Sequence, residues 1–159
     1  MDNRLSTIKK RGCLMILNSQ IDNLVFEICW REGALIALRV EATSKYVSAW
    51  QSCLIQDTNL ENNGESMIDF SFNPTLKRVI TFGKKEINYT PAFEMTLFPA
   101  DARGHIKIEV DIEIEDNNEK SHRCLFYIES EIGLLEKMGL GLKALAHSEV
   151  GRVEMQTNE

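Results

Sequence analysis

One stretch of eleven residues constrains the fold of this chain more than any other. From His105 to Glu115, β-branched residues alternate strictly with charged ones. The apolar series is Ile106, Ile108, Val110, Ile112 and Ile114, and the charged series is Lys107, Glu109, Asp111, Glu113 and Glu115. Because successive side chains of a strand point to opposite faces of a sheet, this pattern predicts a strand with one buried face and one face in water.

Further short apolar segments, separated by turn residues, predict the partner strands. They cover residues 14–17, 24–30, 34–42, 46–55, 78–82, 93–98 and 123–128. Turn signals such as Glu32-Gly33, Gly83 and Asp116-Asn117-Asn118 fall between them. Short strands joined by tight turns pair in the antiparallel sense. We therefore expect an α+β fold in which an antiparallel β-sheet of about six to eight strands is covered on one face by a helix near the C-terminus.

The covering helix is predicted after residue 130, where apolar residues recur at spacings of three and four. They are Ile132, Leu135, Met138, Leu142 and Leu145, and they form one apolar stripe. Ser130 is placed to cap the helix, with Glu131 in its first turn. Gly133, Gly139 and Gly141 weaken it intrinsically, and we expect such small residues to let it approach the sheet closely.

Residues 57–72 admit two interpretations. Asp57 or Thr58 could cap a helix that contains Leu60 and Met67, whereas Asn62-Asn63-Gly64 is typical of a loop. A glycine inside a helix costs about 1 kcal/mol relative to alanine. We favour a weak helix in this region.

The chain has 159 residues, the size of one domain. We assign residues 1–150 to a single α+β domain and residues 151–159 to a frayed tail. The four cysteines form no C-x-x-C pair, and we expect them to be buried free thiols, as in a reducing compartment. Residues 13–17 are too short for the core of a signal peptide, and no apolar stretch approaches the roughly 18 residues of a membrane span. We expect a cytoplasmic protein with no membrane partner.

The charge of the chain is concentrated towards its C-terminus. Residues 109–159 hold 12 acidic and 5 basic residues, whereas residues 1–108 hold 12 acidic and 13 basic ones. Within the acidic part, one strand face carries Glu109, Asp111, Glu113 and Glu115. Three interpretations stay open: a solvated face, a surface for a basic protein partner, or a metal site. We predict partner binding at these four residues.

Other residue patterns argue against a nucleic-acid partner and name no reaction. Lys77-Arg78 and Lys84-Lys85 are too few for a nucleic-acid patch, since phosphate binding needs clustered cations. No metal-ligand cluster, nucleophile motif or phosphate loop occurs in the sequence. We therefore predict no catalytic residue, no metal and no cofactor. Trp30, Tyr46 and Trp50 are expected in the core, although exposed they would serve as anchors for a partner.

Several segments together resemble a known family. They are Leu38-Arg39-Val40-Glu41-Ala42, Phe93-Glu94-Met95-Thr96-Leu97, Gly104-His105-Ile106-Lys107-Ile108-Glu109-Val110, Cys124-Leu125-Phe126-Tyr127-Ile128-Glu129 and the helix from Glu131 to Leu145. Over roughly residues 24–146 this order resembles the WapI-type immunity proteins of bacterial polymorphic toxin systems. The resemblance implies a cytosolic bacterial protein that binds and blocks a toxin, and it carries over no catalytic residue.

The sequence therefore predicts a non-enzymatic binding protein, an immunity protein that neutralises a cognate toxin by direct binding. Two alternatives from other classes stay open. Many short strands could enclose a small molecule or a lipid. An enzyme is also possible without a linear motif, because active sites assemble from distant residues.

Overall fold

Eight strands and two helices make up the described part of the chain. The computed structural model describes residues 22–83, 92–117 and 120–157, without the side chains of residues 92, 114–117, 120 and 121. The first sheet has the order β3 (Ser48–Gln56), β2 (Leu35–Thr43), β1 (Asn23–Glu32) and β8 (Arg152–Gln156). The second has the order β4 (Arg78–Phe82), β5 (Ala92–Leu97), β6 (His105–Asn117) and β7 (Lys120–Glu131). All pairs are antiparallel, which confirms the predicted α+β class.

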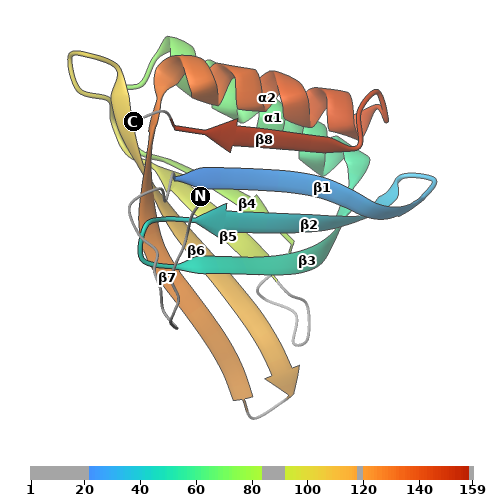
Figure 1. Cartoon of the computed structure of the whole chain (residues 1–159). Coiled ribbons are helices and arrows are strands. Elements are labelled where there is room, and N and C mark those ends of the chain that lie inside the picture. The colour runs from blue at the N-terminus through green and yellow to red at the C-terminus, as the bar shows by residue number, and fades with distance from the viewer. Residues whose placement is uncertain (1–21, 84–91, 118–119, 158–159) are drawn as a thin grey trace, which may run out of the picture.

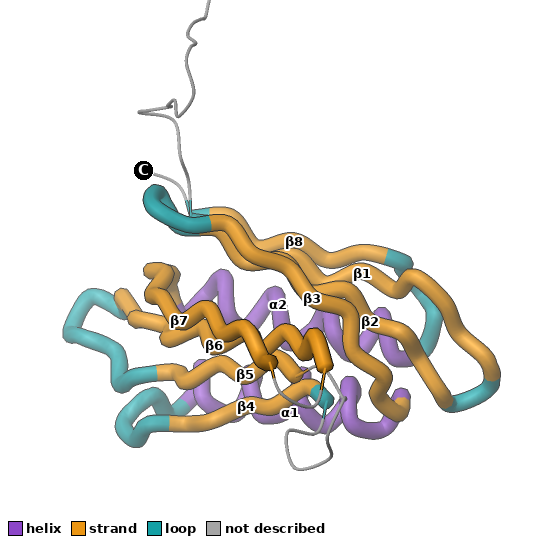
Figure 2. The backbone as a smooth tube through the Cα atoms, turned by 90° about the horizontal axis from the view of Figure 1, so that it is seen from below, coloured by secondary structure: helices purple, strands orange, loops and turns teal. Residues whose placement is uncertain are grey.

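The two sheets form two layers whose strands cross at a steep angle (Figure 1). Helices α1 (Asp57–Phe72) and α2 (Ile132–Ala146) run alongside each other on one side of both layers (Figure 2). Helix α1 contacts β3 and β4, and α2 contacts β8, β7 and β1. The helices therefore join the two sheets, whereas the sequence had suggested one sheet with one covering helix.

Three aromatic rings pack against one another between the sheets. Phe26 of β1 lies 5.0 Å from Phe82 of β4 and 6.1 Å from Phe93 of β5, measured between ring centroids. Phe82 and Phe93 are 5.7 Å apart, and all three side chains are fully buried. Tilted and edge-on rings at these separations attract each other beyond the effect of burial alone. This cluster is one of the places where the first and second sheets are in contact, together with the contacts of β3 with β5 and β6.

The two helices approach each other through glycine. A Cβ atom added to Gly64 would lie 2.6 Å from the carbonyl oxygen of Gly139, and a Cβ on Gly139 would lie 2.6 Å from that of Gly64. A Cβ on Gly141 would lie 2.5 Å from Val153 in β8. The expectation that small residues let α2 approach the sheet closely therefore holds at Gly141, whereas Gly139 permits close approach to α1 instead. It is wrong at Gly133, where nothing lies within 4 Å.

Two of the predicted local features are wrong. Ser130 is the penultimate residue of β7, buried, and its hydroxyl lies 3.3 Å from the sulfur of Met155, so it does not cap α2. The N-cap of α2 is Glu131, which makes no side-chain capping bond. The supposed frayed tail contains β8, which pairs with β1 from Asn23 to Glu27. A polar five-residue strand with only one buried residue gave too weak an apolar pattern to be recognised.

Most predicted elements are confirmed within a few residues. Residues 57–72 form the helix α1, with Gly64 buried inside it. The strand predicted at residues 78–82 is β4, and the alternating strand is β6, which extends to Asn117 and shortens the predicted turn. The strand predicted at residues 14–17 lies outside the described residues.

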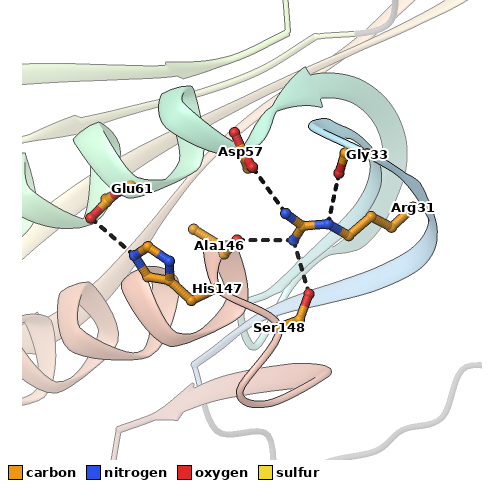
Figure 3. A network of polar contacts seen from close by, with 7 residues as sticks. All are labelled: Arg31, Gly33, Asp57, Glu61, Ala146, His147 and Ser148. Carbon is orange, nitrogen blue, oxygen red and sulfur yellow. Dashed lines mark hydrogen bonds and ion pairs between the residues drawn. The ribbon is translucent and has the colours of Figure 1, made fainter.

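Arg31 connects both helices to the first sheet. Its guanidinium donates hydrogen bonds to the carboxylate of Asp57 at the start of α1 (2.9 Å) and to the carbonyl oxygen of Ala146 at the end of α2 (2.9 Å) (Figure 3). It also donates to Ser148 Oγ (3.0 Å) and to the carbonyl oxygen of Gly33 (3.0 Å). A cation is well placed near the last carbonyl groups of a helix, which carry partial negative charge. One side chain thus fixes the beginning of α1 relative to the end of α2.

Replacing Arg31 with methionine is expected to lower the free energy of unfolding by about 1–2 kcal/mol, because four hydrogen bonds are lost from a partly exposed site. Arg31→Lys should recover little, since an ammonium group cannot reach the same acceptors. Urea denaturation measures both. Arg152→Met is the matched control, because it removes an exposed pair with Glu154 and should change stability by less than about 0.5 kcal/mol. Equal effects at Arg31 and Arg152 would contradict this role.

Candidate protein-binding face

The outward side of the second sheet gathers most of the acidic residues predicted to bind a partner. We call it the acidic face, and we define it by the described side chains of β4–β7 that point away from the Phe26 cluster. They are Val79, Thr81, Glu94, Thr96, Lys107, Glu109, Asp111, Glu113, Arg123, Leu125, Tyr127 and Glu129. The face forms because odd-numbered residues of β6 alternate with the buried Ile106, Ile108, Val110 and Ile112.

Asp111 does not present a free charge on this face. It is only 5% exposed, and its carboxylate accepts two hydrogen bonds from Arg123, at 2.9 Å from Nε and 2.6 Å from Nη2. The hydrogen bond to Asp111, the charge of Asp111 and the charges of Glu113 and Glu94 raise the pKa of Arg123. Asp111 is one of the four residues predicted to bind a partner, and a cation from the neighbouring strand covers its carboxylate. Strand alternation predicts the face of a residue, but not its cross-strand partner.

The side chains of Glu109 and Glu113 are half-buried and reach the surface of the acidic face. Glu109 accepts a hydrogen bond from the hydroxyl of Tyr127 (2.8 Å), and this bond raises the pKa of that tyrosine. Glu113 lies opposite Arg123 in the ladder between β6 and β7. Glu115 belongs to β6, but its side chain is among those that the structure does not describe. Two of the four predicted residues thus offer carboxylates at the described surface.

Large apolar side chains interrupt the charges of the acidic face. Leu125 and Tyr127 are each 47% exposed, and Val79 is 51% exposed. The face carries five carboxylates and two cations, a formal charge of −3. Exposed apolar groups within a surface of one charge are typical of protein-binding sites, since burial supplies affinity and complementary charge speeds encounter. Sequence reasoning missed Leu125 and Tyr127, although their parity with Arg123 could have placed them there.

The other face that carries exposed aromatic residues is the outward side of the first sheet. Trp30 and Trp50 are 46% and 51% exposed, and Tyr46, in the turn before β3, is 82% exposed. The expectation that they pack in the core is therefore wrong. The guanidinium carbon of Arg39 lies 4.1 Å from the ring centroid of Trp50, a cation–π contact. Their exposure is the condition under which the sequence allowed them to anchor a partner.

Two open hollows adjoin at one end of the sheets and share Lys107, Glu129 and Thr157. The larger has a volume of about 730 Å³ and is lined in part by Phe98, Asp101 and His105. The ammonium group of Lys107 lies 5.2 Å from the Phe98 ring and 5.3 Å from the Tyr127 ring. These hollows are places on the described surface where a small molecule could bind.

The described cysteines differ in their surroundings, and all are free. Cys53 is buried, and burial raises its pKa to about 12, so it is almost entirely protonated at neutral pH. Cys124 is partly buried. Cys29 is exposed, at the bulge where the pairing of β1 with β2 shifts register, which contradicts its predicted burial.

In the described part of the chain, no three or more His, Cys, Asp or Glu side chains lie together as metal ligands would. Neither described helix is long and apolar enough to cross a membrane. Comparison of the chain with protein-family models, with curated proteins and with solved structures finds no match.

Proposed function

We propose that this chain is a non-enzymatic cytoplasmic protein that neutralises a bacterial toxin by direct binding, with the acidic face as its contact surface. The observation that carries the proposal is the combination of Glu109 and Glu113 with the exposed Leu125 and Tyr127 on one face of a sheet. A toxin that acts on nucleic acid would present a basic surface, and an acidic face complements the charge of such a partner. The resemblance to WapI-type immunity proteins supports the same class.

Charge reversal at Glu109 and Glu113, two carboxylates of the acidic face, tests the proposal. Full-length tagged protein is used to capture partners from lysate of the source bacterium, and the captured proteins are quantified by mass spectrometry. Glu109→Lys combined with Glu113→Lys should reduce capture of a basic partner at least tenfold, because attraction becomes repulsion at the contact. Glu32→Lys combined with Glu149→Lys is the matched control, since both residues are exposed and lie away from the acidic face.

Neutralisation itself is tested in cells. Expression of the captured partner in a heterologous bacterium should stop growth, and co-expression of this chain should restore it. The control double variant should restore growth and the acidic-face double variant should not. Equal capture and equal rescue by both double variants would reject the acidic face as the contact surface. A captured partner that does not stop growth would reject the proposal that the partner is a toxin.

A small-molecule-binding domain is the second candidate, favoured by Lys107 between two aromatic rings in the surface hollows. A thermal-shift screen with metabolites and lipids discriminates the two functions. A reproducible increase in Tm with one ligand class, abolished by Lys107→Met, would favour this candidate.

A further inference from the structure

The backbone of β7 presents unpaired groups along one edge of the second sheet. In an antiparallel pair, residues alternately direct both their N–H and C=O groups towards the partner strand or away from it. Glu129 directs both groups away from β6, since its N–H donates to Asp22 Oδ2 (2.7 Å) and its carbonyl oxygen accepts from Thr157 Oγ1. By this alternation Tyr127, Leu125 and Arg123 direct theirs to the same side. No partner for these outward groups is found among the described residues.

The other strands at the sheet edges are each interrupted by a side-chain contact or by charge. On β3, the outward N–H of Ser52 donates to the side chain of Gln51 (3.0 Å). On β4, the carbonyl oxygen of Thr81 accepts a hydrogen bond from Asn63 of α1 (2.9 Å). The edge strand β8 is short, with charged Arg152 and Glu154 at its outward positions. Side chains that occupy or charge an edge prevent another strand from pairing with it. Among the described residues, contacts to the edge of β7 are found at Glu129 and not at the outward groups of the five residues from Arg123 to Tyr127, which we call the open edge.

The surroundings of this open edge define the strand that would fit it. On the outward side lie Leu125, Tyr127 and Arg123, whose guanidinium is held by Asp111. One strand further lie Glu109 and Glu113. An added strand would lie roughly 10 Å from β6, two strand spacings, so that a long cationic side chain could approach these carboxylates. On the inward side the edge meets Phe126, which is 8% exposed, and Cys124, which is partly buried. The matching sequence alternates basic residues facing outward with apolar residues facing inward.

We propose that the open edge of β7 binds an extended, basic segment of a protein partner by strand addition, with the main chain of that segment pairing at Arg123, Leu125 and Tyr127. The inference rests on the proposed function and adds its binding mode. Main-chain hydrogen bonds supply affinity in strand addition, and alternate side chains supply specificity. An added strand of five residues would cover roughly 17 Å of the edge.

Hydrogen exchange of the free, full-length protein gives the first test. The amides of Leu125 and Tyr127 should exchange at least tenfold faster than those of Phe126 and Ile128, which point towards β6. Protection of Leu125 and Tyr127 in the free protein would show that the edge is already covered and would overturn the proposal.

Synthetic peptides give the second test. The probes are an acetylated and amidated (Lys-Val)₃ peptide, the matching (Glu-Val)₃ peptide, and (Lys-Val)₃ with alternate amides N-methylated. The lysine peptide should bind at least tenfold more tightly than both others and should slow exchange at Leu125 and Tyr127, because N-methylation removes the donors of one strand edge. Equal binding of the plain and N-methylated peptides, or no binding of the lysine peptide, overturns strand addition.

Two variants of Leu125 separate this proposal from the proposed function. Leu125→Pro removes an N–H that points away from β6, a position where an edge strand tolerates proline, and it should abolish binding of the lysine peptide. Leu125→Ala keeps the N–H and should retain binding within about threefold. If Leu125→Pro stays folded, no longer binds the lysine peptide and still captures the toxin, strand addition at β7 is rejected while the proposed function stands. Equal capture by the charge-reversal variant Glu109→Lys/Glu113→Lys and its control would instead reject the proposed function.

Discussion

Replacing Phe26 with alanine is expected to lower the free energy of unfolding by about 3–5 kcal/mol, the range for truncating a fully buried phenylalanine. Phe26 is the only ring of the three-ring cluster that comes from the first sheet, and it contacts both Phe82 and Phe93 of the second. Its loss therefore leaves a cavity where the two layers meet. Neither sheet can close it without moving away from the helices that contact both.

Urea denaturation followed by circular dichroism measures this effect. Phe72→Ala is the matched control, because Phe72 is the last residue of α1 and is 73% exposed. Its change should be within about 0.5 kcal/mol. A loss below about 1.5 kcal/mol at Phe26 would mean that the sheets do not depend on the aromatic cluster for their mutual packing.

Replacing Gly139 with alanine should destabilise the protein by about 2 kcal/mol, although alanine is the better helix former. The added Cβ would lie 2.6 Å from the carbonyl oxygen of Gly64 and 3.2 Å from the backbone nitrogen of Ile68. Backbone atoms of α1 cannot move aside as the end of a flexible side chain can. The two helices must therefore separate along their whole contact, and this cost exceeds the roughly 1 kcal/mol gained from helix propensity.

The same helix provides the control for Gly139. Gly133→Ala adds a Cβ that meets nothing within 4 Å, so only the propensity gain operates. Its free energy of unfolding should be unchanged or raised by up to about 1 kcal/mol. Opposite signs at the two positions, measured by thermal and urea unfolding, are the expected result. Stabilisation by both alanines would contradict close packing of α1 on α2.

Local patterns predicted the elements but not their arrangement. The alternation from His105 to Glu115 is strong because every second residue of β6 is buried, and the apolar stripe of α2 is strong for the same reason. The division into two sheets depends on contacts such as that of Phe26 with Phe93, 67 positions along the sequence, which no local period encodes. The local sequence shows Ser130 directly before an apolar stripe, which predicts a helix cap. It does not show that strand β7 continues through Ser130 to Glu131.

For the acidic face too, the sequence predicted which residues share a face but not which residues contact each other. Strand parity placed Glu109, Asp111 and Glu113 on one face, and that placement is confirmed. The sequence could not show that Arg123 would neutralise Asp111, because their contact requires the register between β6 and β7. It also could not show the open edge of β7, since an edge is defined by which strands are absent beside it.

The pairing of β1 with β8 affects how the protein can fold during synthesis. Asn23 pairs with Gln156, so a strand made early must wait for one made 133 residues later. At translation rates of about 5–20 residues per second, that wait is on the order of ten seconds. Until then one edge of β1 is unpaired, close to Leu24 and Phe26, which the finished fold buries completely. A nascent chain in this state is a natural client for a ribosome-associated chaperone, and rapid overproduction favours its aggregation.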